Sequence, residues 1–390
     1  MPIVLNRDGK TKMEYLFYVS AFLCVYSYFL YPLILTIVPG RKHKHGITGD
    51  VVSYPQLDLI VTAHNEEQRI TEKLENSLAI DYPQDLFQII VASDCSTDAT
   101  DRIVESYADR GVRLVRADKR KGKEYAQLCA IHESKGEVLV FSDVATRIPK
   151  GALRVLADRF RNPEVGALSS EDRFISNNGA LVGEGAYVKY EMWLRRLESE
   201  HAGLIGLSGS FFAARRTVCT DWDIYSPSDF NTALNCAMKG LVAITCAEVV
   251  GVYRDVKEPG LEYRRKLRTV IRGMTAIARH PEVLDPFRMG LFAFQVWSHK
   301  VMRWGVPWFM LLFAASSLAL AGDGLVYQFA LWLQAIFYGL AATGWLFGTL
   351  RKYAAVRIVF FFVQTNLALA HALLLFLGGK RMTVWTPSQR

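Results

Sequence analysis

The sequence predicts a membrane-anchored α/β protein in which a globular domain with a parallel sheet lies between apolar helices. Two observations predict the membrane part: residues 15–40 carry no charged side chain, and residues 305–350 carry Asp323 as their only one. A third predicts the domain: strands alternate with helices after the first apolar segment, which is typical of a parallel sheet covered on both faces.

The composition excludes a disordered chain and a small disulfide-stapled scaffold, because 51% of the 390 residues are hydrophobic and 22% are charged. The six cysteines show no zinc-knuckle or redox spacing, so we expect reduced thiols. The net charge of +8 permits nucleic acid, an anionic membrane surface or an anionic substrate as a partner. However, residues 47–260 carry −7 and residues 261–303 carry +6. We therefore expect no nucleic acid as a partner, and a basic segment suited to lipid headgroups or a diphosphate.

Four transmembrane helices are expected. Residues 15–40 are long enough to span about 30 Å of hydrocarbon, and we interpret them as an uncleaved anchor. Residues 286–304 interleave aromatic and basic side chains, as an amphipathic interface helix does. The predicted division of the chain is an anchor (1–46), a globular domain (47–260), a basic interface segment (261–304), transmembrane helices (305–379) and a tail (380–390).

Basic residues around the apolar segments predict the orientation. The cations of residues 41–44 follow the anchor directly, so the positive-inside rule places the globular domain in the cytoplasm of a multi-pass protein of the inner or plasma membrane. Residues 351–352 agree with this orientation. Residues 380–381 do not, because four crossings would put them outside. Either the last apolar segment does not cross, or the rule is overridden there.

Within the domain, polar residues follow three of the expected strands. These ends are His64–Glu66, Ser93–Asp94 and Ser142–Asp143, and ligands of parallel sheets lie beyond such carboxyl ends. We therefore expect a binding site at this edge. The expected strands are 56–64, 87–93, 112–118 and 137–143, and the expected helices are 65–80, 94–110 and 123–134.

Phosphate binding needs a different element from the usual glycine-rich motifs, since neither GxGxxG nor GxxxxGK[ST] is present. The segment RKGK (120–123) is a candidate. Gly122 permits close backbone approach, and Lys123 offers a charge to a diphosphate. The alternative is an ordinary solvated loop.

These motifs resemble those of the membrane-anchored family 2 glycosyltransferases, the group of the cellulose, chitin and hyaluronan synthases. TAHNEE (62–67), SDCSTDAT (93–100), RKGK and FSDVAT (141–146) match the family's order along the chain. The resemblance implies a nucleotide-sugar-binding doubly wound sheet of the GT-A type. It also implies a set of donor-binding residues, which are Asn65, Glu66, Asp94, Asp98, Lys123 and Asp143.

The resemblance further implies a divalent metal, Mg²⁺ or Mn²⁺, at the family's DxD position. Asp143 takes the place of the first Asp, but Ala145 stands where the second is expected. One protein carboxylate together with phosphate oxygens is a sufficient set of hard oxygen ligands for such an ion.

Acceptor-site and catalytic residues follow downstream. The turn around Ser208 and Gly209 resembles the family's acceptor element, and Asp229 stands at the position of the catalytic base. A single displacement at the sugar needs a carboxylate to take the proton of the attacking hydroxyl. The alternative for Asp229 is a helix N-cap after Pro227.

The family's QxxRW motif is incomplete, because only Arg272 remains of it. Arg268 and Arg272 are four residues apart, so they share one helical face and are candidates for clamping a diphosphate or acceptor. The alternative is that they are cations of the membrane surface, as we expect for Arg264 and Arg265.

The function implied is an inverting transfer of a sugar from a nucleotide-diphosphate sugar, with a UDP-sugar as the first candidate. The acceptor is a saccharide or a lipid-linked molecule, within cell-surface or extracellular polysaccharide synthesis. Three alternatives stay open: a polyprenyl-phosphate sugar transferase, an inactive membrane scaffold with the same fold, and a transporter.

Overall fold

The computed structural model describes residues 7–40, 54–175, 186–254 and 259–382. By its contacts the chain divides into two compact units. One, the membrane-helix unit, comprises residues 1–37, 258–271 and 296–381. The other, the sheet unit, comprises residues 38–257, 272–295 and 382–390. The predicted cations of residues 41–44 and the boundary at 46/47 lie outside the described residues.

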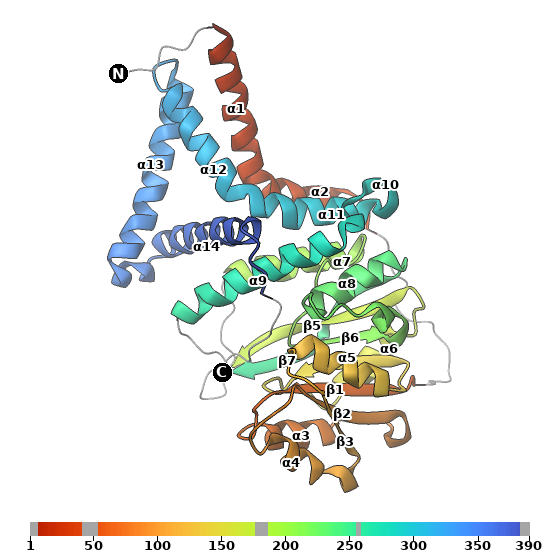
Figure 1. Ribbon diagram of the computed structural model, residues 1–390. Helices are drawn as coiled ribbons and strands as arrows, with labels where there is room; N and C mark the ends of the chain where they lie inside the picture. Colours follow the sequence, from red (N-terminus) through yellow and green to blue (C-terminus); the bar gives the residue numbers. More distant parts are fainter. Residues whose placement is uncertain (1–6, 41–53, 176–185, 255–258, 383–390) are drawn as a thin grey trace. The chain divides into compact units, whose positions relative to one another are not determined.

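The sheet unit is built on one seven-stranded sheet with the order β3-β2-β1-β4-β6-β5-β7 (Figure 1). Strands β1 to β4 are mutually parallel, as predicted. The rest of the sheet is mixed, because β6 runs antiparallel to both β4 and β5, while β5 and β7 are parallel. The strands are β1 (Leu57–Ala63), β2 (Phe87–Ser93), β3 (Val112–Arg116), β4 (Val138–Asp143), β5 (Val165–Ile175), β6 (Phe211–Arg215) and β7 (Val242–Arg254).

Apolar side chains alternate between the two faces of this sheet and form one core on each. Leu59 and Val61 of β1 belong to one core, which also holds Leu74 and Leu156 from helices on that face. Ile60 belongs to the other core, together with alanines of α5 and α8. The helices of this unit are α3 (Ile70–Leu78), α4 (Thr100–Glu105), α5 (Lys123–Glu133), α6 (Ala152–Arg159), α7 (Ala186–Glu200), α8 (Ser228–Met238), α10 (Pro286–Met289) and α11 (Leu291–Val296).

Two of the helices start later than the sequence pattern predicts. Helix α3 begins at Ile70 rather than residue 65, and α4 begins at Thr100 rather than residue 94. The residues in between form turns, in which Asn65 and Cys95 adopt left-handed backbone angles with φ of 53° each. This conformation is uncommon outside glycine and costs free energy, so it marks both turns as special.

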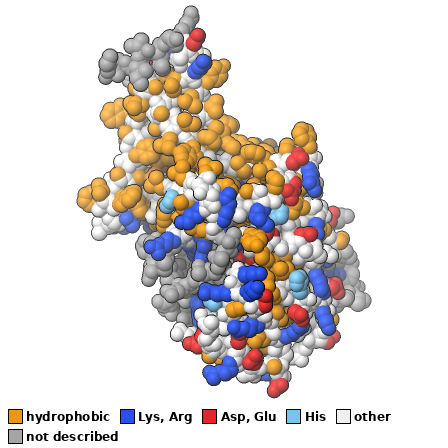
Figure 2. Space-filling view, in the orientation of Figure 1, with side chains coloured by type: hydrophobic (Ala, Val, Ile, Leu, Met, Phe, Trp, Pro, Cys, Tyr) orange, Lys and Arg blue, Asp and Glu red, His pale blue; other side chains and the backbone are white. Residues whose placement is uncertain are grey.

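The membrane-helix unit contains long apolar helices, and its hydrophobic side chains gather over α1, α12 and α13 (Figure 2). Four helical runs are long and apolar enough to cross a membrane: Asp8–Ile37, Leu291–Ala319, Leu325–Leu346 and Ala354–Leu377. The second run begins within the segment predicted as a separate interface helix, so no break occurs near residue 304. The helices are α1 (Arg7–Val25), α2 (Tyr31–Ile37), α12 (Met302–Ala319), α13 (Leu325–Leu346) and α14 (Ala354–Leu377), and α9 (Pro259–Arg279) has residues in both units.

Candidate functional site

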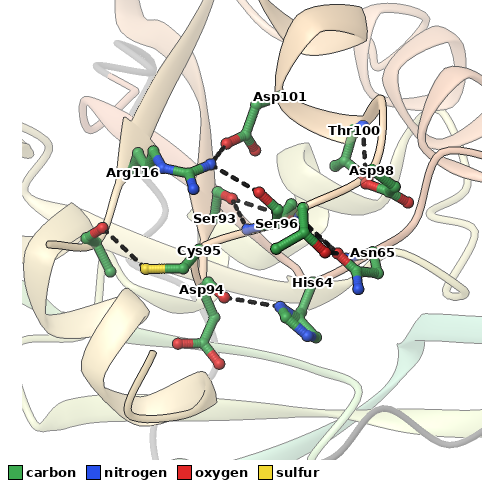
Figure 3. Close-up of polar contacts among 12 residues, drawn as sticks. His64, Asn65, Ser93, Asp94, Cys95, Ser96, Asp98, Thr100, Asp101 and Arg116 are labelled. Atoms are coloured by element: carbon green, nitrogen blue, oxygen red, sulfur yellow. Dashed lines mark hydrogen bonds and ion pairs between the residues drawn. The ribbon is translucent and has the colours of Figure 1, made fainter. Parts of the chain in front are cut away.

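The turns that follow β1 and β2 are joined by hydrogen bonds between their polar residues (Figure 3). The Asn65 side-chain oxygen accepts from the backbone N–H of Thr97 at 2.8 Å, and the Asn65 N–H donates to Ser96 Oγ at 3.2 Å. The His64 ring bonds the carbonyl of Asp94 through Nδ1 at 2.7 Å. Residues that follow β2 therefore stabilise the left-handed turn at Asn65. Such contacts are expected where the carboxyl ends of two parallel strands converge.

Asp98 belongs to the same network. One carboxylate oxygen accepts from the backbone N–H and the hydroxyl of Thr100, at 2.9 and 2.5 Å. The other accepts from the backbone N–H of Glu67 at 3.1 Å. These bonds lower the pKa of Asp98 against the opposing effect of its partial burial, which is the largest single influence. The carboxylate thus fixes the two turns relative to each other, a role that the sequence motif alone did not reveal.

Asp94 holds the loop that contains Gly122. Its Oδ1 accepts from the backbone N–H groups of Lys121 and Gly122 at 3.2 and 3.1 Å. Gly122 has a φ of 99°, a conformation that favours glycine. Asp94 is fully buried, and its Oδ2 has no hydrogen-bond partner among the described residues. This buried acceptor is available to a donor group on a ligand.

Lys123 brings three of the predicted motifs to one point. Its amine donates to Asp143 Oδ1 at 2.5 Å and to the carbonyl oxygen of Gly209 at 2.8 Å, and the residue is only 6% exposed. The predicted phosphate-binding loop, the metal-binding position and the acceptor-site turn therefore meet around this one ammonium group. The surface-loop alternative for residues 120–123 does not account for this burial.

A second carboxyl group lies in the field of Asp143. The pKa of Glu66 is raised, first by burial, while the neighbouring Arg69 opposes the shift and the negative charges of Asp143 and Asp98 add to it. Carboxyl groups that repel one another in this way favour a cation between them.

A complete protein cage for a metal is absent from the described ranges, in which no three His, Cys, Asp or Glu side chains form a ligand group. The donor set instead fits an ion held by Asp143, with Glu66 near, and completed by phosphate oxygens and water.

Asp229 lies beside Gly209 and so reaches the same point. A Cβ atom at Gly209 would stand 3.2 Å from Asp229 Oδ2. Asp229 is the second residue of α8, Pro227 is the N-cap, and no side chain makes the cap hydrogen bond. The alternative of an N-cap role for Asp229 is therefore wrong, because another residue occupies that position.

The turn before β6 is ordered by serine hydroxyls. The backbone N–H of Ser208 donates to Ser169 Oγ at 2.8 Å, and the hydroxyls of Ser208 and Ser210 lie 3.0 Å apart. This turn presents the Gly209 carbonyl to Lys123 and leaves the small Gly209 next to Asp229.

Arg272 forms a buried ion pair with Glu124, the residue after Lys123. The Nη2 to Oε1 distance is 2.6 Å, and the two side chains are 9% and 2% exposed. The pair joins Arg272 of α9 to the first turn of α5, next in sequence to Lys123. Arg268, one helical turn earlier, belongs to the membrane-helix unit.

Lys73 is a residue that sequence reasoning missed. It lies on the buried face of α3, is 2% exposed, and its amine donates to Ser142 Oγ at 2.7 Å and to the Thr146 carbonyl at 2.6 Å. Burial lowers its pKa to about 7, against the opposing effect of Asp143. Lys73 thus fixes the strand end that carries Asp143. The sequence did contain a signal for this buried residue, because Lys73 lies three residues after Ile70 on the apolar stripe of an expected helix.

The sheet unit thus carries a buried lysine and several carboxylates at the ends of its strands. The chain resembles a mannosyltransferase from Pyrobaculum calidifontis, solved in complex with GDP-Man and Mn²⁺, with a TM-score of 0.68 and 24% identity. That likeness covers 95% of this chain and 100% of the other. It establishes a common fold.

Residues 58–221 match the family model described as glycosyl transferase family 2. This match lies within the sheet unit and agrees with the family resemblance that the motifs indicate.

Curated relatives agree with this family. The beta-monoglucosyldiacylglycerol synthase of Synechocystis sp. is 29% identical over 182 residues, which are 44% of this chain and 38% of the relative. The poly-beta-1,6-N-acetyl-D-glucosamine synthase of Staphylococcus epidermidis is 23% identical over 43% of this chain and 42% of its own length. The chain thus spans less than half of these two relatives. An N-acetylglucosaminyltransferase of Rhizobium meliloti is 26% identical over 73% of this chain and 78% of its own length.

Proposed function

We propose that the protein is an inverting glycosyltransferase of the membrane. It moves a sugar from a nucleotide-diphosphate sugar, with a UDP-sugar as the first candidate, to a hydroxyl of a saccharide or lipid-linked acceptor. The observation that carries the proposal is the meeting of Lys123, Asp143, Gly209 and Asp229 at the carboxyl ends of the parallel strands.

The donor half of the proposal rests on Asp94, Lys123 and Asp143. The unpartnered Oδ2 of Asp94 suits an N–H group of a nucleotide base. The Lys123 ammonium supplies positive charge for a diphosphate. Because Lys123 is largely shielded from water, its charge favours the departing nucleotide diphosphate more than it would in water.

Asp143 is the residue that would hold Mg²⁺ or Mn²⁺, with Glu66 close by. When bound, the ion supplies charge for the diphosphate leaving group. The relative solved with Mn²⁺ motivates this choice of ion.

Asp229 is proposed as the general base. It takes the proton from the acceptor hydroxyl as that oxygen attacks the anomeric carbon, while the bond from that carbon to the nucleotide diphosphate breaks on the opposite side. One displacement inverts the anomeric configuration. Gly209 leaves room beside the Asp229 carboxylate, where the hydroxyl must approach within hydrogen-bond distance.

The membrane location is supported by the four long apolar helical runs. We propose a multi-pass protein of the plasma or inner membrane with its transferase domain in the cytoplasm. The names of the relatives, a glycolipid synthase and a polysaccharide synthase, make lipid and saccharide acceptors the first to be tried. Arg268 and Arg272 remain candidates for contacts with the acceptor.

The test replaces Asp229 by Asn in the detergent-purified protein. Donor binding should stay within a few-fold, whereas sugar transfer should fall by roughly 100-fold or more, because general base catalysis contributes about 10²–10⁴-fold. Asp85→Asn is the matched control, since Asp85 also occupies the first turn of a short helix and is exposed. An equal loss of binding and transfer would demote Asp229 to a structural residue.

The Asp229→Asn variant also distinguishes the proposed function from that of a polyprenyl-phosphate sugar transferase. A lipid phosphate attacks without needing a base, so an Asp229→Asn protein that retains transfer to a polyprenyl phosphate would favour that acceptor. Intact nucleotide binding without turnover of any donor by the wild type would favour the inactive scaffold.

A further inference from the structure

The fourth apolar helical run, α14, does not follow the course of the other helices of the membrane-helix unit. In Figure 1, α14 runs across the direction that α1, α12 and α13 share. A helix of 24 residues is about 36 Å long, which suffices to span the hydrocarbon layer. Length and composition therefore allow α14 to cross the membrane, but its packing contacts indicate a different position.

One end of the unit is marked by an ion pair. Lys10 of α1 and Asp323, between α12 and α13, lie 3.2 Å apart, and Tyr327 donates to Glu14 at 3.2 Å. These polar groups fix the level at which α1 starts and α12 ends. We call it the outer end, because the opposite end of α12 leads into the rest of the chain.

Helix α14 packs against the other end of the unit. A Cβ at Gly344, near the end of α13, would meet Phe360 of α14 at 3.0 Å. The ring of Phe362 lies 5.4 Å from that of Tyr28, which is about 27 Å along the helix from Lys10. A crossing helix would next accompany α13 back toward Leu325, whose side chain is instead 82% exposed.

The second half of α14 is bonded to α9 instead. Lys266 donates to Thr365 Oγ1 at 3.1 Å, and the hydroxyl of Tyr263 lies 3.1 Å from His371 Nδ1. Arg264 and Arg265 of the same helix are exposed. A segment with this many cations belongs at the headgroup level, because charged side chains are costly in hydrocarbon. Thr365 and His371, six residues apart along α14, are therefore both held against the basic part of α9.

Helix α14 is as apolar in composition as the other runs, but three of its polar side chains share one face. Arg357, Gln364 and His371 are spaced by seven residues, so they share one face. Leu367 and Leu374 form a second stripe and are 48% and 56% exposed. This arrangement lets the polar stripe face headgroups while the exposed leucines face acyl chains.

From these contacts we propose that α14 lies in the cytoplasmic surface of the bilayer together with the basic part of α9, and that the chain crosses the membrane three times. The occupant of this surface is the headgroup layer of an anionic phospholipid leaflet, to which the cations of α9 are complementary. Lys380 and Arg381 then lie on the same side as Arg351 and Lys352, and the conflict with the positive-inside rule disappears. The inference rests on the proposed membrane location.

Spin labels measure the depth of exposed positions in the full-length protein. A variant whose native cysteines are replaced, and which still binds nucleotide, is reconstituted into phosphatidylcholine vesicles that contain phosphatidylglycerol. Single cysteines replace Ile358, Leu367 and Leu374 of α14, which are 59%, 48% and 56% exposed. Matched controls on α13 are Leu325, Ile336 and Leu346, which are 82%, 58% and 75% exposed. Oxygen and a water-soluble nickel complex report the depth of each label by collision.

The three α13 labels should read shallow, deep and shallow, and the three α14 labels should all read shallow. A deep reading at Leu367 between two shallow ones would overturn the inference and leave the membrane location intact. Shallow readings at all three α13 positions would overturn the membrane location and the inference with it.

A second measurement does not depend on depth. Membrane-impermeant maleimide is applied to sealed vesicles that carry Lys380→Cys, Lys352→Cys or Gly322→Cys in the same background. All three positions lie outside the long apolar helices α12, α13 and α14. Labelling of Lys380→Cys should follow that of Lys352→Cys and oppose that of Gly322→Cys. If it follows Gly322→Cys, α14 crosses the bilayer and the proposal is wrong.

Discussion

Replacement of Arg272 by Met should destabilise the sheet unit strongly, because it leaves a buried carboxylate without its partner. Glu124 and Arg272 are 2% and 9% exposed and are joined at 2.6 Å. Breaking such a pair costs about 3–5 kcal/mol, whereas replacing both partners by apolar side chains is often neutral. We therefore expect the Arg272→Met, Glu124→Met double variant to be more stable than Arg272→Met alone.

The expected loss of stability can be measured as a decrease in the melting temperature. About 2–4 °C are lost per kcal/mol in a domain of this size, so Arg272→Met should melt roughly 6–20 °C below the wild type. Arg110→Met is the matched control, because the Arg110–Glu75 pair has the same distance of 2.6 Å but both side chains are 50% exposed. Such an exposed pair contributes about 0–1 kcal/mol.

Thermal unfolding of the detergent-purified variants is the assay, with nucleotide binding measured alongside. The double variant should bind nucleotide within a few-fold of the wild type, since Arg272 contacts Glu124. The reasoning is refuted if Arg272→Met melts no lower than Arg110→Met, or if the double variant is as unstable as the single one. Wild-type stability of the double variant combined with lost nucleotide binding would instead support a diphosphate clamp.

Three further predictions concern the strand-end site. Asp143→Asn should abolish the part of nucleotide binding that EDTA removes, and calorimetry that finds this part undiminished would exclude Asp143 as the metal ligand. Gly209→Ala brings a methyl group to 3.2 Å from Asp229 Oδ2 and should lower kcat roughly tenfold at unchanged donor affinity, since small misplacements of catalytic groups are costly; an unchanged kcat speaks against the base. The pKa of Lys73 is lowered from 10.5 to about 7 in the folded protein, so the free energy of unfolding should rise with pH between these values, and Lys73→Met should lack this part of the rise. Equal slopes for wild type and Lys73→Met in denaturant titrations at pH 7 and pH 9 would contradict the Lys73 prediction.

The first half of the fold could be predicted because its strands are short apolar runs followed by polar turns. Strand β2, Phe87–Ser93, has the predicted bounds. The second half could not, because its pairing is set by distant segments. The five residues of β6 lie antiparallel between β4 and β5. The local sequence FFAAR does not indicate which strands β6 pairs with.

The site was predictable to the extent that motifs mark strand ends. The meeting of Lys123 with Asp143 follows from the expected convergence of carboxyl ends at one edge. Gly209 joins them because β6 runs antiparallel to β4, which local sequence does not predict. The partners Glu124 and Lys73 were not predictable, because burial of a charged residue depends on which helices pack against it. The direction of α14 could not be predicted either, because a hydropathy pattern reports the length and composition of an apolar segment but not its direction.

Release of nucleotide by the purified protein is the decisive measurement for the proposed sugar transfer. The full-length protein in detergent is given a panel of nucleotide sugars with and without EDTA, beside Asp143→Asn and Asp229→Asn. We predict that the wild type turns over one class of nucleotide sugar and that EDTA and Asp143→Asn stop the release. Asp229→Asn should bind the donor without transferring the sugar. Nucleotide binding without release from any sugar, or release that neither EDTA nor these variants affect, would contradict the proposed transfer.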